Sequence, residues 1–311
     1  LWKQRSGRYP AVPSKVSTVR AILQSVARAK VPFFQRTTSV PPLRYNGSAV
    51  LSRRLFLYSP VLYFAGCRKK RGAGFPGYAF VANEEGRALA AVDLTIFAVT
   101  KHIRLGGNPT AVLAHPARDS IYALDAGIGM IEEVGVSSMS VRARIRLGAR
   151  AASMRFSHDH RHLWVLYTEP RQLVRISLQT FRPDGAIPLP DEGADFTISP
   201  DGRLAAVAYS TSGSISLAHL DELRGAAPLR LGELVTCVEF RNDGKYLMTG
   251  VGGKPSLVVL DVALRRVAVR LPLAVEPRNF CYKSDGGQLF VTGPGMDAVV
   301  IVYPYTMEIA E

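Results

Sequence analysis

The amino-acid sequence predicts an all-β fold made of repeated four-stranded sheets, on three observations. Residues 77–311 repeat with a constant spacing of 42 residues, and a fixed period of this length indicates a repeat architecture. Each repeat holds short apolar runs bounded by turn residues, which favours strands over helices. Two runs in each repeat alternate apolar and mixed residues, the pattern of a strand with one buried face. Four short strands in about 40–45 residues are typical of a β-propeller blade.

The first two strands of each repeat are marked by apolar runs. The repeats begin, without insertions, at Gly77, Asp119, Arg161, Arg203, Lys245 and Gly287. Residues 163–166 (LWVL) represent the first strand, and Leu257 and Leu260 represent the second. One blade cannot bury both of its faces, so neighbouring blades must stack. The sixth repeat ends before its third strand is expected, so we expect about six blades here, the last incomplete, in a fragment of a seven-bladed protein.

The third and fourth strands alternate apolar residues with others. Ile187 and Leu189 represent the third strand, and Phe196 and Ile198 represent the fourth. The fourth strand ends in a turn such as 199–202 (SPDG), in which the Asp side chain bonds nearby backbone and Gly is free to take a positive φ. These turns are expected to link blades at one end of the ring. We expect an unknown protein or small-molecule ligand to bind there.

Three segments carry a resemblance to a known repeat. Residues 256–261 (SLVVLD) of the fifth row, and residues 187–190 (IPLP) and 196–202 (FTISPDG) of the third row, match successive parts of the YVTN-type propeller repeat, which the rows of this chain resemble. The resemblance covers residues 77–311 and implies a β-propeller. Similar propellers occur in lactonase-like enzymes, in surface-layer and adhesion proteins and in binding scaffolds, so the resemblance leaves the function open.

The amino-terminal segment differs from the repeats. Residues 1–50 contain nine Lys or Arg residues, no acid and no sign of the 42-residue register. The chain begins with Leu1, and its first methionine is Met130. We interpret residues 1–50 as an over-extended reading frame with the natural start at Leu51. A basic disordered arm is the alternative.

Residues 51–67 have the order of a bacterial export signal. Arg53 and Arg54 resemble the twin-arginine motif, and an apolar run of twelve residues follows. The run is too short for a membrane-spanning helix, which needs about 20 residues, but it suits the apolar region of a signal. The four residues ending at Cys67 (FAGC) resemble a lipobox, so we expect acylation of Cys67 and a membrane anchor. The alternative for residues 51–67 is a buried apolar segment with a chance arginine pair. Residues 68–76 would form a basic tether, with an ordinary solvated linker as the alternative.

The charge distribution argues against nucleic-acid binding. The chain has a net charge of +14, but residues 1–74 hold fifteen basic residues and no acid. The rest therefore has 39 − 15 = 24 basic and 25 acidic residues, a net charge of −1. A propeller of this charge lacks the basic surface that nucleic acid requires.

The candidate chemical sites are few. His158, His160 and His162 form the most metal-like run, but two of them align with the turn at 199–202, so we expect a turn variant, with a metal or ligand contact as the alternative. Three Asp-Gly turns recur and are interpreted as structural. Cys237 and Cys281 are expected to remain free thiols. Without a phosphate loop, nucleophile elbow or haem motif, we predict no catalytic residue, cofactor or metal.

The sequence therefore predicts an exported, lipid-anchored propeller in the periplasm or at the cell surface, with a binding or interaction role. A lactonase-like or other hydrolytic enzyme is the alternative, and an electron-transfer or metal-handling propeller is a third. An enzyme should gather ionisable residues with shifted pKa values at the ring centre. A scaffold should present a wide, mixed polar surface there.

Overall fold

The computed structural model describes residues 76–295 and 297–310, which form six antiparallel sheets. The first sheet contains β1 (Tyr78–Asn83), β2 (Ala88–Asp93) and β3 (Ala98–Arg104). The second contains β4 (Ala111–Ala114), β5 (Ser120–Asp125), β6 (Met130–Gly135) and β7 (Ser140–Arg146). The third contains β8 (Arg150–Phe156), β9 (His162–Glu169), β10 (Gln172–Ser177) and β11 (Arg182–Pro188).

The other three sheets follow the same order. The fourth contains β12 (Asp195–Ile198), β13 (Leu204–Tyr209), β14 (Ser214–His219) and an outer strand broken into β15 (Arg224–Gly225) and β16 (Leu229–Arg230). The fifth contains β17 (Val235–Phe240), β18 (Tyr246–Val251), β19 (Ser256–Asp261) and β20 (Arg266–Pro272). The sixth contains β21 (Asn279–Tyr282), β22 (Leu289–Thr292), β23 (Val300–Tyr303) and β24 (Glu308–Ile309).

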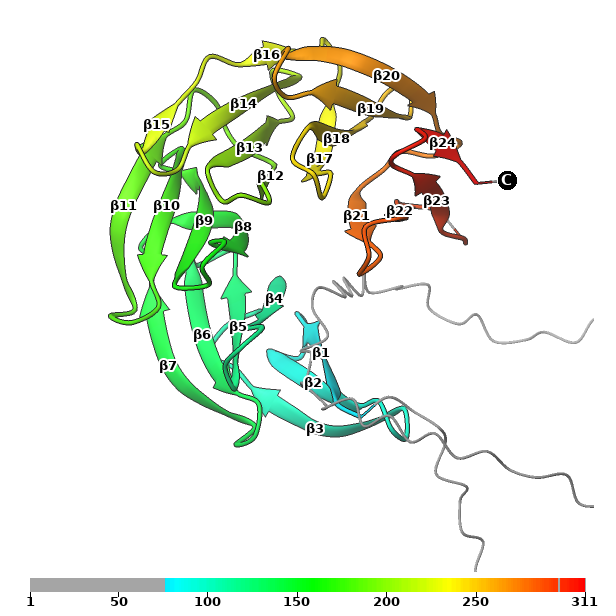
Figure 1. The fold of residues 1–311 in the computed structure, drawn as a ribbon. Coiled ribbons are helices and arrows are strands. Elements are labelled where there is room, and N and C mark those ends of the chain that lie inside the picture. Colours follow the sequence, from blue (N-terminus) through cyan, green and yellow to red (C-terminus); the bar gives the residue numbers. More distant parts are fainter. Residues whose placement is uncertain (1–75, 296, 311) are drawn as a thin grey trace, which may run out of the picture.

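The sheets stand side by side around a common centre (Figure 1), which confirms the predicted β-propeller. In the second to sixth sheets the innermost strands are β4, β8, β12, β17 and β21, and each later strand lies farther out. Among the described residues no helix is long and apolar enough to cross a membrane.

The sheets are offset by one strand from the rows of the sequence. The fourth strand of each row pairs with the first strand of the next row, as β4 does with β5. Each innermost strand is therefore joined to its own sheet by the turn that follows it, and this turn contains Asp-Gly after β12, β17 and β21. The sixth row was expected to end before its third strand, but β24 is that strand. The last sheet therefore has four strands, and the first sheet has three.

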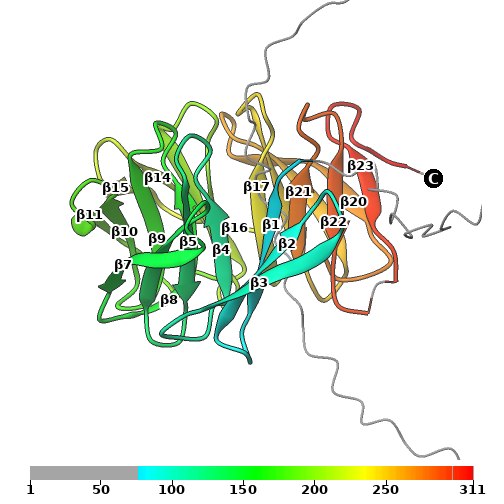
Figure 2. The ribbon, with the colours of Figure 1, turned by 90° about the horizontal axis from the view of Figure 1, so that it is seen from below.

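This offset corrects the expected position of the blade-linking loops. Consecutive strands run antiparallel, so successive loops lie at alternate ends, as the side view in Figure 2 shows. Residues 115–119 connect β4 to β5 within one sheet, whereas residues 105–110 link the first sheet to the second. The turns at 115–119 share an end with the loops between the second and third strands of the rows, and the blade-linking loops lie at the opposite end.

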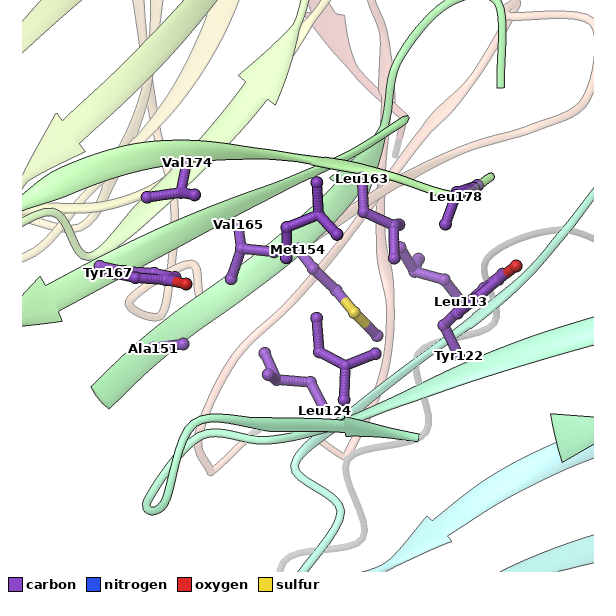
Figure 3. Packing of buried hydrophobic residues seen from close by; sticks show 12 residues of the cluster. Leu113, Tyr122, Leu124, Ala151, Met154, Leu163, Val165, Tyr167, Val174 and Leu178 are labelled. Carbon is purple, nitrogen blue, oxygen red and sulfur yellow. The ribbon is translucent and has the colours of Figure 1, made fainter. Parts of the chain in front are cut away.

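The core consists of apolar layers between neighbouring sheets. Five hydrophobic clusters each join two adjacent sheets. In the layer between the second and third sheets, Met154 of β8 lies between Leu124 of β5 and Leu163 of β9 (Figure 3), and all three are at most 1% exposed. Among the described residues no such cluster joins the sixth sheet to the first. Accordingly Val299 beside β23 is 52% exposed, whereas Leu257, one repeat earlier, is fully buried.

Candidate functional site

The innermost strands, which line the centre of the ring, share one repeat position of mixed chemistry. The position recurs every 42 residues and lies between two apolar residues, whose side chains point to the opposite face of the strand. Its occupants are Leu113, Arg155, Thr197, Glu239 and Cys281. We call these five residues the axial ring. The register is the same in each sheet: Arg155 pairs with Trp164, Thr197 with Ala206 and Glu239 with Met248.

Hydrogen bonds and an ion pair link the axial ring across sheets. The Thr197 hydroxyl of β12 donates a hydrogen bond to Glu239 Oε1 of β17 at 2.7 Å. Arg155 Nη2 of β8 lies 3.4 Å from Oδ1 of Asp195 on β12. The other oxygen of Asp195 accepts a hydrogen bond from the backbone N–H of Val238 at 3.3 Å. Three successive sheets are therefore tied together at the axis by polar groups rather than by apolar packing alone.

The axial environment shifts the protonation of Glu239. Desolvation by the surrounding protein raises the pKa of its carboxyl above the usual 4.5, although Arg155 and the Thr197 hydrogen bond act in the opposite direction. Part of the side chain nevertheless remains accessible. A carboxyl that is both enclosed and reachable can exchange a proton or a hydrogen bond with a small ligand.

Within the described residues no disulfide joins Cys237 and Cys281, as the sequence predicts. Burial raises the pKa of Cys237, and the charges of Asp195 and Glu239 raise it further. Burial and Glu239 also raise the pKa of Cys281. Both side chains are therefore held as neutral thiols at neutral pH, the less nucleophilic form.

The histidine run is placed in the turn between β8 and β9. His160 adopts a positive φ of 55°, and its carbonyl accepts a hydrogen bond from His115 Nε2 at 3.0 Å. His162 opens β9 and lies 3.4 Å from Asp184 Oδ2. His158 is exposed at the turn. Within the described part of the chain no group of His, Cys, Asp or Glu side chains is arranged to hold a metal ion.

The recurring Asp residues stabilise their own turns, as the sequence analysis expected. Asp201 accepts a hydrogen bond from the N–H of Arg203 at 3.1 Å, and Asp243 accepts one from the N–H of Lys245 at 3.1 Å. Hydrogen bonds from neighbouring side chains lower the pKa of both carboxyls. The carboxylates of Asp201 and Asp243 are therefore engaged in hydrogen bonds within their own turns.

The axial ring was not recognised as a site from the sequence alone. The sequence showed that the residue between the two apolar positions of each fourth strand is often polar, and Arg155 and Glu239 were among them. What it did not show is that this position of one row, Thr197, meets the same position of the next row, Glu239. The signal in the sequence was that this position changes in chemistry from row to row, whereas the positions on either side of it stay apolar. Cys67, Arg53 and Arg54, proposed for anchoring and export, lie outside the described residues.

The stacked sheets and their shared axis define the chain as a β-propeller. No protein-family model and no curated protein matches it. Among solved structures it is similar to Kuenenia stuttgartiensis hydrazine synthase, with a TM-score of 0.67 and 18% identity over 78% of this chain and 80% of that chain. It is also similar to the dihydro-heme d1 dehydrogenase NirN in complex with DHE, with a TM-score of 0.61 and 17% identity over 75% of this chain and 54% of that chain. At these identities the likeness establishes the fold alone.

Proposed function

We propose that this propeller is a binding scaffold that recognises a small polar ligand or a partner at the axial ring. The observation that carries the proposal is the chemical variety of the ring. The apolar positions on either side hold only apolar residues in all five innermost strands, because they fill the layers between sheets. The ring position instead holds Arg155, Thr197, Glu239 and Cys281 in four of the strands, and in β4 it holds Leu113, which packs in the layer between the second and third sheets.

Packing alone does not account for this variety. Polar groups taken out of water cost free energy unless they are hydrogen-bonded, and apolar residues at these positions would avoid that cost. Thr197 is 1% exposed and Arg155 retains 21% of its side-chain exposure. Groups already paired and held in place by rigid strands are pre-organised to exchange a hydrogen bond with a ligand at little further cost.

The proposed location is the bacterial cell envelope. The twin-arginine motif at Arg53 and Arg54 and the lipobox at Cys67 support export and a lipid anchor, which would place the propeller in the periplasm or at the cell surface. The YVTN-type resemblance of the repeats, a class that includes surface-layer and adhesion proteins, supports the same assignment. The membrane would then be the first partner of the protein.

Glu239 favours a second candidate function. A carboxyl with a raised pKa, hydrogen-bonded to Thr197 and close to the Arg155–Asp195 pair, has the features of a general acid at a hydrolytic centre. A lactonase-like or other hydrolytic propeller is therefore the alternative. The two functions separate by turnover: a hydrolase should open chromogenic lactones or esters and lose that activity in Glu239→Gln.

The binding proposal is tested by a thermal-shift screen of small polar metabolites, followed by variants. Compounds that raise the melting temperature should lose at least half of their effect in Glu239→Gln and in Thr197→Val. Glu222→Gln is the matched control, since Glu222 is exposed and paired only with Arg224 at the surface. Compounds whose effect is the same in all three variants would contradict an axial site.

The anchor is tested by metabolic labelling with a radioactive fatty acid in a bacterial host. Label should enter the membrane-bound protein and be lost in Cys67→Ala, and export should fail in the Arg53→Lys, Arg54→Lys double variant. An unlabelled protein whose intact mass matches residues 1–311 would contradict the proposed processing.

A further inference from the structure

Within the described part of the chain, the first sheet has a free strand edge toward the centre of the ring. In the other five sheets an innermost strand pairs with the next strand out, as β4 does with β5. β1 occupies the position of β5 in its own sheet, one repeat earlier, and pairs with β2 on one side. Among residues 76–295 and 297–310 no strand pairs with its other side.

The repeat defines where another strand would pair. β4 faces residues Ile121 to Leu124 of β5, and the same positions of β1 are Ala79 to Ala82. The carbonyl oxygens of Ser120 and Leu124 accept hydrogen bonds from His115 and Thr110 at 2.9 and 2.7 Å. The corresponding residues of β1 are Tyr78 and Ala82. In a strand the backbone N–H and C=O groups of alternate residues point to the same neighbouring strand. The backbone N–H and C=O groups of Tyr78, Phe80 and Ala82 therefore point to the free edge.

This edge lacks the devices that protect exposed edges. Natural sheets blunt an open edge with charged residues, proline or bulges. The outer edge strands follow that rule: β3 carries Lys101 and Arg104, and β7 carries Arg142, Arg144 and Arg146. β1 reads YAFVAN, with no charge, no proline and no bulge in its pairing with β2. An edge of this composition is suited to being covered.

The other sheets also define the side chains that the covering strand must carry. One apolar residue faces the position equivalent to Val81; in the five sheets this residue is Val112, Met154, Phe196, Val238 or Phe280. A second faces the position equivalent to Ala79; it is Ala114, Phe156, Ile198, Phe240 or Tyr282. One repeat before β4 the sequence reads KKRG (residues 69–72), with Lys70 and Gly72 at the two positions that are apolar in the other repeats.

We propose that the free edge of β1 binds an extended strand of a partner polypeptide. The strand runs antiparallel to β1, places apolar side chains opposite Ala79 and Val81, and tolerates any side chain opposite Phe80. Main-chain hydrogen bonds to β1 supply affinity, and the two apolar positions supply specificity. The bound strand would also add a side chain to the axial ring.

The test uses the full chain and a fluorescent peptide that copies residues 193–204, which include β12. Fluorescence anisotropy should show saturable one-to-one binding. The same peptide with Phe196→Ser and Ile198→Ser should bind at least tenfold more weakly, because it lacks both apolar contacts. Ala82→Pro in the protein should weaken binding by a similar factor, since proline removes an N–H at the free edge. Ala82→Val, which keeps the N–H, is the matched control.

A second measurement covers the case in which Ala82→Pro does not fold. In the unmodified protein, bound peptide should slow amide hydrogen exchange at Tyr78, Phe80 and Ala82. Absence of binding would overturn the proposal. So would protection confined to other strands, or equal affinity for the serine-substituted peptide.

Discussion

At the scale of single residues, the Thr197–Glu239 hydrogen bond shows most directly how the sequence repeat builds the candidate site. The two residues are 42 positions apart, one repeat, and meet because they occupy the same position of neighbouring innermost strands. The Thr197 side chain is buried, so removing its hydroxyl leaves a carboxylate oxygen without that donor. We expect Thr197→Val to lower the free energy of unfolding by about 1.5–3 kcal/mol, the range for hydrogen bonds to charged groups. Urea unfolding at pH 7 measures it, and a loss below about 0.5 kcal/mol would contradict this role.

Glu239 should make the stability depend on pH in a defined direction. Its pKa is raised in the folded protein, so the folded state holds the proton more tightly than the unfolded chain. The associated stability is present in full below the usual pKa of 4.5 and is lost as the pH rises through the folded value. Glu239→Gln does not titrate. It should therefore gain stability relative to the unmodified protein between pH 4 and pH 8, as measured by urea unfolding; a relative loss over that interval would contradict the assigned shift.

Arg241 fastens the fifth sheet to the sixth. Its guanidinium lies 4.3 Å from the ring centre of Tyr246 and 4.8 Å from that of Tyr305, pairs with Asp243 at 2.7 Å and donates to the carbonyl of Pro304. Lysine keeps the charge but lacks the planar fork. Arg241→Lys should therefore cost about 1.5–3 kcal/mol of unfolding free energy. Arg224→Lys, at an exposed pair, should change it by less than about 0.5 kcal/mol.

At the scale of elements, the turn after four of the five innermost strands, β8, β12, β17 and β21, depends on one position with positive φ. That position is His160 with φ 55°, Gly202 with φ 76°, Gly244 with φ 70° and Gly286 with φ 74°. A Cβ on Gly202 would lie 2.5 Å from the Cβ of His158. We expect Gly202→Ala to cost at least about 1–2 kcal/mol, the usual penalty for a left-handed residue with a side chain. His160→Asn, at a position that already accommodates a side chain, should stay within about 0.5 kcal/mol, and equal costs for the two variants would contradict the explanation.

The sequence predicted the strands well because their signals are local. Alternation in Phe196 and Ile198 and the turn at 199–202 are properties of neighbouring residues. The assignment of strands to sheets was wrong by one strand, because a period marks where a pattern recurs and not which strands pair. The axial ring was missed for a related reason: Thr197 and Glu239 look like ordinary strand residues until five strands meet at one centre.

At the scale of the whole molecule, the five apolar layers connect the sheets in a line. In such arrays each unit is stabilised by its neighbours, and the end units have one neighbour instead of two. The first and sixth sheets should therefore exchange their amide hydrogens faster than the third and fourth. Hydrogen exchange measured by mass spectrometry would show protection greatest in β9 and β13 and weakest in β1 and β23. Uniform protection across all six sheets would indicate that the ends are closed by contacts beyond those of the described residues.

The central claim is that the axial ring is where this propeller binds its ligand, and crystals soaked with a library of small polar fragments test it most directly. The account predicts bound fragments within hydrogen-bonding distance of Glu239, Thr197 or Arg155. Fragments bound only at the outer strands or in the loops, with the Thr197–Glu239 and Arg155–Asp195 contacts undisturbed, would contradict it.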